Sequence, residues 1–196
     1  MFQVRIHGRG GQGVVTAAEM LSIAAFREGR HAQAFPSFGS ERTGAPVVAF
    51  CRIDTREIRL REPVMQPDAL IIQDATLLHQ IDVFAGLVPS GYILINTTRT
   101  FEALGVGEVT NGLAQERIAT VNASGIALEA VGRPLPNAAL LGGFAALTGR
   151  ISLESVAAAI RETFAGRIAE ANVTAAERAY ACVQTEIRER LHAQAD

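Results

Sequence analysis

The order of apolar and polar residues predicts strands alternating with helices. From Phe2 to His7 the two kinds alternate with period two, which indicates a strand, whereas apolar residues recur at helical spacing from Gly13 to Glu28. Gly29 then follows as a C-cap. The same reasoning predicts strands at His31–Phe35, Val47–Ile53 with a hairpin partner at Glu57–Leu60, Ala69–Gln73, Tyr92–Asn96 and Arg117–Asn122, and a short edge element near Val109.

The C-terminal third is predicted to be helical. Ser124 caps a helix that Gly132 ends, and further helices are expected at Asn137–Thr148, from Ser152, and from about Val173. The second of these contains Gly142-Gly143, which predicts close backbone approach because each glycine costs about 1 kcal/mol against alanine. We expect an α/β fold: a three-layer Rossmann-like sandwich with a mostly parallel sheet, in one domain spanning residues 1–196, helical from about residue 124.

The first strand and helix are joined by a complete G-x-G-x-x-G motif. Its residues are Gly8, Arg9, Gly10, Gly11, Gln12 and Gly13. Glycines let the backbone take positive φ and let a phosphate approach, and the helix behind them offers unpaired N–H groups and a positive dipole end. The motif predicts phosphate or pyrophosphate binding. The alternative is a tight turn whose glycines serve only the packing of helix on strand.

The partner residue of a nicotinamide site is missing. Such a site needs Asp or Glu about 20 residues further on, at the end of the second strand, to bind the ribose hydroxyls. That position holds Gln33, and the nearest acids are Glu28 and Glu41. Asp74 also follows a predicted strand end, where ligands often bind, although it is better placed to cap a helical turn that begins near Thr76.

The stretch from Pro36 to Pro46 is a second unusual segment. Two prolines and two glycines favour a loop of defined shape. It carries Ser37, Phe38 and the adjacent pair Glu41 and Arg42, so it has a cation for an anionic group and a ring for a ligand or a partner. A solvated surface loop remains the alternative.

Composition excludes several classes of function. The net charge of −2 and a pI near 6.1 argue against a general nucleic-acid binder. All 18 basic residues are Arg, which excludes a Schiff-base lysine and the lysine of a Walker loop. Two cysteines and four scattered histidines are too few for a metal or iron–sulfur site. No stretch is long enough to span a membrane, so a cytoplasmic protein is expected.

Motifs spread over nearly the whole chain match a known family. The matching segments are residues 8–18, 33–39 with Glu41-Arg42, 44–47, 126–129 with 132–134, 141–145 and 152–155. With them the chain resembles the gamma subunit of the 2-oxoacid:acceptor oxidoreductases, the pyruvate:ferredoxin oxidoreductase group. The resemblance implies a subunit of an enzyme that oxidatively decarboxylates a 2-oxo acid and forms an acyl-CoA.

The resemblance also implies how the work is divided among the subunits. The chain has no thiamine motif, no cluster cysteines and no nucleophile paired with a base, so no catalytic residue is assigned to it. Thiamine diphosphate, Mg and the iron–sulfur clusters are expected on alpha, beta and delta-type partner subunits, with ferredoxin or a flavoprotein subunit as electron acceptor. This chain would bind CoA, through the glycine motif and the Ser37–Arg42 segment, and provide assembly contacts. A nicotinamide- or flavin-binding domain and a purely structural subunit are the alternatives.

Overall fold

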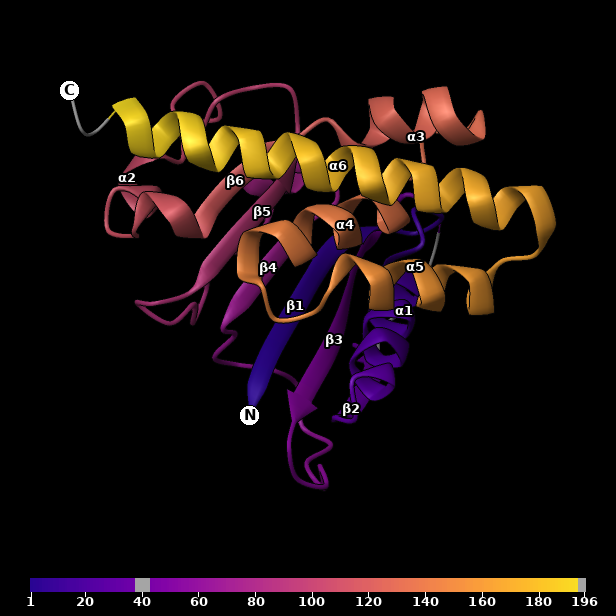
Figure 1. Cartoon of the computed structure of the whole chain (residues 1–196). Helices are drawn as coiled ribbons and strands as arrows, with labels where there is room; N and C mark the ends of the chain where they lie inside the picture. Colours follow the sequence, from indigo (N-terminus) through magenta and orange to yellow (C-terminus); the bar gives the residue numbers. More distant parts are fainter. Residues whose placement is uncertain (38–42, 194–196) are drawn as a thin grey trace.

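The computed structural model describes residues 1–37 and 43–193. Its centre is a six-stranded sheet in the order β2-β3-β1-β4-β5-β6 (Figure 1). β1 pairs with β4 in parallel, and β4–β5 and β5–β6 are also parallel, whereas β3 runs antiparallel to both β1 and β2. The sheet is therefore mostly parallel with one reversed strand, as expected. The strands are β1 (Phe2–Arg9), β2 (His31–Pro36), β3 (Pro46–Asp54), β4 (Ala69–Ile72), β5 (Tyr92–Asn96) and β6 (Ile118–Val121).

The long helices cover one face of this sheet, and they bury the larger of two apolar cores against it. They are α1 (Val14–Arg27), α3 (Ala123–Val131), α4 (Asn137–Thr148), α5 (Leu153–Thr163) and the 28-residue α6 (Gly166–Ala193). The other face is covered by a thinner layer of loops, with η1 (Ala75–His79) and α2 (Gly107–Thr110), whereas η2 (Gln115–Arg117) contacts α6 and α4. These layers confirm the predicted α/β sandwich with a helical C-terminal third.

Helix α6 holds the C-terminal part together. It crosses over α4 and also packs on α3 and α5 (Figure 1). The stripe predicted from Val173 to Ile187 faces the core, because Val173, Ala176 and Val183 are buried. Helix α4 is enclosed beneath it, with Gly142 and Gly143 both buried, as their sequence predicted. None of the helices in residues 1–37 and 43–193 is long and apolar enough to cross a membrane.

Three local predictions are wrong. Residues 57–60 form no strand, and the chain that follows them supplies the Glu62 carbonyl that accepts from Arg52 Nη2 at 2.5 Å. The cap of α3 is Asn122, whose side chain accepts from Gly125 N, while Ser124 lies inside the helix. The short element near Val109 is the helix α2 instead of an edge strand.

Candidate functional site

The glycine motif forms the turn between β1 and α1. Gly11 and Gly13 have positive φ values of 93° and 72°, a region that side chains other than glycine rarely adopt. Gly13 is the N-cap of α1, and no side chain in the described part of the chain caps this end of the helix. The N–H groups of the first turn, from Val14 onward, therefore have no intrahelical partner.

The glycines of the turn have different surroundings. A β-carbon on Gly8 would lie 2.6 Å from Val14 Cγ2, and one on Gly13 would lie 2.5 Å from Asn137 Nδ2. These two glycines therefore permit close packing, which fits the packing alternative. A β-carbon on Gly11 would have no neighbour within 4 Å, although Gly11 lines a depression beside the turn. Packing alone gives no reason for glycine at position 11.

Hydrogen bonds among Arg9, Gln12 and Asp74, here called the latch, hold the turn in shape. Gln12 Oε1 accepts from the backbone N–H of Arg9 at 2.8 Å, and Gln12 Nε2 donates to Asp74 Oδ2 at 2.9 Å. Arg9 Nε forms an ion pair with the same oxygen at 3.1 Å. Asp74 also accepts from the backbone N–H of Thr76, so it caps η1 as predicted. One carboxylate thus fixes the turn to the end of β4.

The latch determines the charge at the turn. Partial burial acts to raise the pKa of Asp74, but hydrogen bonds from Thr76 and Gln12 and the positive charge of Arg9 outweigh it, and the pKa is lowered. The carboxylate is therefore ionised at neutral pH. Because Arg9 also donates to the Gly44 carbonyl and to Gln80 Oε1, each at 3.0 Å, its guanidinium is committed to protein partners. Of the two described positive features at the turn, the helix N-terminus and Arg9, the helix N-terminus is the one left for an anion.

The loop after β2 returns beside the turn. Gly10 N donates to the Ala45 carbonyl at 2.9 Å, and Gly44 N donates to the Gly10 carbonyl at 3.1 Å. Ser37 is exposed at the start of the loop, and its N–H donates to Val48. The predicted site residues Phe38, Glu41 and Arg42 lie outside the described residues. The sequence suggested two separate anion-binding elements, and the structure brings the described part of the second against the first.

A depression of about 260 Å³ opens at this junction. Among residues 1–37 and 43–193 its lining contains no carboxylate, and α1 has no acidic residue in its first turn. An anion there would meet the positive end of the helix dipole without a facing negative charge in the lining. The lining residues are Arg9, Gly10, Gly11, Gly13, Val14, Val15, Thr16 and Val47.

Two other polar groups near the sheet do not belong to this depression. Gln33 pairs with Arg52 across β2 and β3, and its side-chain oxygen is buried with no hydrogen-bond partner among the described residues. His7 is buried on β1 and accepts from Arg5 Nε at 3.0 Å. Burial, and then the charge of Arg5, lower the His7 pKa to about 3, so the imidazole is neutral. Neither residue lines the depression at the glycine turn.

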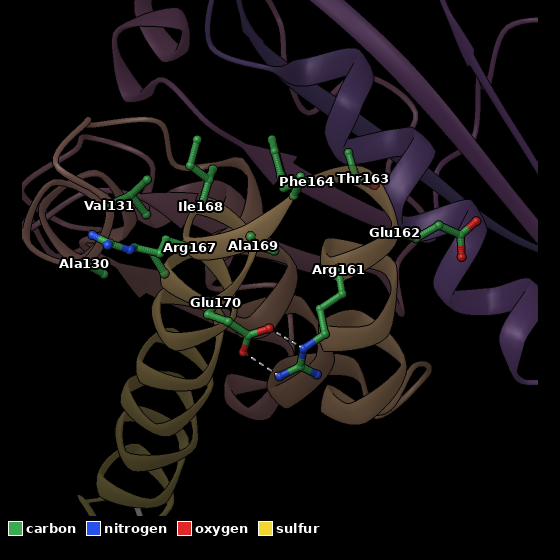
Figure 2. A pocket seen from close by; sticks show the side chains of 13 residues that line it. Ala130, Val131, Arg161, Glu162, Thr163, Phe164, Arg167, Ile168, Ala169 and Glu170 are labelled. Carbon is green, nitrogen blue, oxygen red and sulfur yellow. Dashed lines mark hydrogen bonds and ion pairs between the residues drawn. The ribbon is translucent and has the colours of Figure 1, made fainter.

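A larger hollow of about 1080 Å³ lies where α5 meets α6 (Figure 2). Val131, Phe164 and Ile168 make its surface apolar. Its Arg161 and Glu170 bind each other through two hydrogen bonds of 2.8 and 2.9 Å. Glu162 pairs with Arg27 of α1 outside the hollow, and among the described residues Arg167 has no ion-pair partner. The hollow therefore has one free charge and no set of free polar groups pointing at a common ligand. It shares no lining residue with the glycine turn.

Sequence reasoning missed one residue of the site, Asn137, and the contacts of another, Asp74. Asp74 was predicted as a cap, yet its contacts to Arg9 and Gln12 depend on β1 and β4 being neighbours. Asn137 lies against Gly13 although 124 positions separate them along the chain. Its place at the start of a helix that follows two prolines was the only local signal.

Comparison with known proteins gives a consistent result. The model of the family described as pyruvate ferredoxin/flavodoxin oxidoreductase matches residues 3–182. The common gamma subunit of the pyruvate/ketoisovalerate oxidoreductases of Thermococcus kodakarensis is 48% identical over 182 residues, 92% of this chain and 96% of that protein. The pyruvate synthase subunit PorC of Methanocaldococcus jannaschii is 49% identical over 180 residues, with the same two coverages.

Solved structures agree with this. The pyruvate oxidoreductase subunit PORC of Thermotoga maritima has a TM-score of 0.76 at 35% identity, covering 92% of this chain and 95% of that chain. The 2-oxoglutarate:ferredoxin oxidoreductase of Magnetococcus marinus, solved with coenzyme A bound, has a TM-score of 0.72 at 17% identity. The match covers 94% of this chain and 31% of that chain, and it extends to the fold alone.

Proposed function

The chain belongs to the pyruvate ferredoxin/flavodoxin oxidoreductase family as a gamma-type subunit, and on this premise we propose that it receives the pyrophosphate of CoA at the Gly8–Gly13 turn. The enzyme oxidises a 2-oxo acid in the presence of CoA and yields an acyl-CoA, CO₂ and two electrons. In this proposal the chain takes no part in bond breaking. It holds the CoA so that its thiol reaches the reacting carbon on a partner subunit.

The uncapped N-terminus of α1 beside Gly11 is the observation that carries this proposal. The helix end and the turn offer backbone donors and a partial positive charge, and Gly11 leaves open space in front of them. Such a helix end favours an anion by about 0.3–1 kcal/mol when exposed and up to about 2 kcal/mol when partly buried. A pyrophosphate would supply the negative charge that complements this positive helix end.

The remaining chemistry belongs to other subunits in this proposal. Thiamine diphosphate with Mg on the alpha and beta subunits would supply the decarboxylation, and clusters on the delta-type subunit would take the two electrons. Ferredoxin or a flavoprotein subunit would then receive them. The chain's own two cysteines fit this division, because Cys51 is buried alone and Cys182 is exposed, with no pairing between them. We place the complex in the cytoplasm.

The test compares two glycines that flank helix α1, one before it and one after it. Gly11 and Gly29 both have positive φ, and a β-carbon on either would meet nothing within 4 Å, but Gly29 lies at the opposite end of α1. Gly11→Val should raise the apparent KM for CoA at least tenfold, equivalent to about 1.4 kcal/mol. Gly29→Val carries similar backbone strain and should leave that KM unchanged.

Both variants should be measured in the assembled complex. CO₂ release in a single turnover without CoA reports the step before CoA is used, and it should be spared in both. An unchanged CoA dependence in an intact Gly11→Val complex would contradict the proposal and leave the turn as a packing device. Tight binding of NAD or FAD to the isolated chain, lost in Gly11→Val, would favour the dinucleotide alternative.

A further inference from the structure

The two edges of the sheet differ in whether side chains bind their outward backbone N–H and C=O groups. At the β6 edge, the backbone N–H of Thr120 donates to Glu186 of α6 at 3.0 Å, and Arg190 Nη1 donates to the Ile118 carbonyl at 3.4 Å. Glu186 and Arg190 also form an ion pair with each other. Side chains of α6 therefore occupy the backbone groups that a further strand would need, which blocks pairing at this edge.

The β2 edge has no such cover among the described residues. Ser37 N donates to the Val48 carbonyl, and bonded pairs alternate in an antiparallel ladder, so Gln33 and Phe35 bond to β3. The N–H and C=O groups of Ala32 and Ala34 therefore point away from the sheet, and no partner for them is found in residues 1–37 and 43–193. Pro36 ends this row because it lacks an N–H.

A hollow of about 620 Å³ runs beside the same edge. Its apolar lining residues are Ala32 of β2 and Ile23 and Phe26 of α1, and Ser22, Arg27 and Glu162 complete the lining. The Phe26 side chain is large, and the residue is 75% exposed. The ion pair between Arg27 and Glu162, at 2.9 Å, lies at the rim and joins α1 to α5. Free backbone groups and the apolar side chains of this hollow are thus adjacent on one surface.

We propose that the β2 edge receives an extended β-strand from a neighbouring subunit of the oxidoreductase complex. The added strand would exchange hydrogen bonds with Ala32 and Ala34. Every second side chain of it would lie over the hollow and cover Phe26, so we expect those side chains to be large and apolar. This inference rests on the chain being one subunit of a multi-subunit enzyme.

A second copy of this chain fits the edge less well. In β2 the residues facing α1 are Ala32 and Ala34, because both pack against the core on that side. Paired β2 strands would therefore place single methyl groups over a hollow of about 620 Å³. A strand with larger side chains would fill that space and bury more apolar area, which is the main source of binding free energy.

Amide hydrogen exchange tests the pairing directly. In the isolated chain the amides of Ala32 and Ala34 should exchange rapidly, and in the assembled complex they should slow at least tenfold. Gln33 and Phe35 provide an internal control, because their amides already donate to β3. Equal exchange of Ala32 and Ala34 in both states would overturn the proposal, and so would protection caused by self-association of the isolated chain.

A proline variant adds a functional test. Ala34→Pro removes an outward N–H that β3 does not use, so the isolated chain should keep its melting temperature within a few degrees. Its affinity for the remaining subunits should fall at least tenfold. Phe26→Ser should also weaken assembly, whereas Leu128→Ser, another exposed apolar side chain, should not.

Normal assembly of the Ala34→Pro and Phe26→Ser variants would contradict the proposal. These results are separable from the CoA proposal. In the complex that Ala34→Pro does form, the apparent KM for CoA should match that of the parent, because β2 residue 34 does not line the depression at the glycine turn.

Discussion

Gly142 of α4 packs directly against Ala176 of α6. A β-carbon on Gly142 would overlap the carbonyl oxygen of Ala176, which belongs to the backbone and cannot rotate away. The two helices therefore cross at a separation that only glycine permits. The helix-propensity cost of this glycine is offset by the burial of α4, which lies between α6 and the sheet.

Gly142→Ala should lower the free energy of unfolding by about 1–3 kcal/mol, because one helix must move away from the other. Gly143→Ala is the matched control. Its β-carbon would lie 3.2 Å from Val183 Cγ2 and 3.3 Å from Leu94 Cδ2, side chains that can adjust, and alanine favours the helix. Thermal unfolding of both variants checks this. Equal melting temperatures for Gly142→Ala and the parent would contradict the close crossing.

The elements that local sequence specifies were predicted well. The β1 strand, the glycine turn and α1 follow from periodicity and from the backbone freedom of glycine, both of which act over a few residues. Helix α4 begins and ends where the sequence indicated, and Gly132 ends α3 in the left-handed conformation. The family motifs lie on these same segments, and family membership is confirmed by the comparisons.

What the sequence did not predict depends on contacts between distant segments. Residues 57–60 have a strand-like pattern, but both sides of β3 are already paired, with β1 and with β2, so no position remains for a hairpin partner. Ser124 has the chemistry of a cap, yet Asn122 fills that role, and the Ser124 hydroxyl accepts from Asn96 Nδ2 at 2.8 Å. Neither outcome can be inferred without the neighbouring strand.

Glu186 gives a prediction about pH. Burial raises the pKa of its carboxyl, and this outweighs the opposing influence of Arg190 and of the hydrogen bonds from Thr120. A carboxyl whose pKa is higher in the folded than in the unfolded state destabilises the fold as it ionises. The protonated carboxyl contributes favourably to stability below the ordinary pKa of about 4.3, and this contribution is lost as the pH rises through the pKa of the folded state.

The comparison variant is Glu186→Gln, which keeps an oxygen that can accept from Thr120 without titrating. The melting temperature of the parent minus that of the variant should therefore decrease between pH 4 and pH 7. Thermal unfolding across that range measures the difference. A difference that increases with pH would show that the ion pair with Arg190 dominates and that the burial argument is wrong.

Asp74 should show the opposite dependence on pH. Its pKa is lowered, so its ionised form stabilises the fold above the ordinary pKa of about 3.9, and this contribution is lost as the pH falls through the folded value. Asp74→Asn should cost about 1 kcal/mol at pH 7, through the hydrogen bonds and ion pair that hold the turn. The parent and the variant should converge below pH 4. Urea unfolding at pH 7 and pH 3 measures both values, and an equal gap at the two pH values would rule out the charge as the cause.

The isolated chain should be colourless and catalytically silent. Iron–sulfur clusters are held by several thiolates, and this chain has two cysteines in all. Burial raises the pKa of the Cys51 thiol to about 12, so it is protonated and cannot act as a thiolate ligand or nucleophile in the folded chain. The chain should therefore contain less than a stoichiometric amount of iron and should not reduce a viologen dye with a 2-oxo acid and CoA. Adding the partner subunits to the same sample should start the reaction, which shows that the subunit was competent. Dye reduction by the chain alone, lost in a variant of one of its own residues, would overturn the division of work between the subunits.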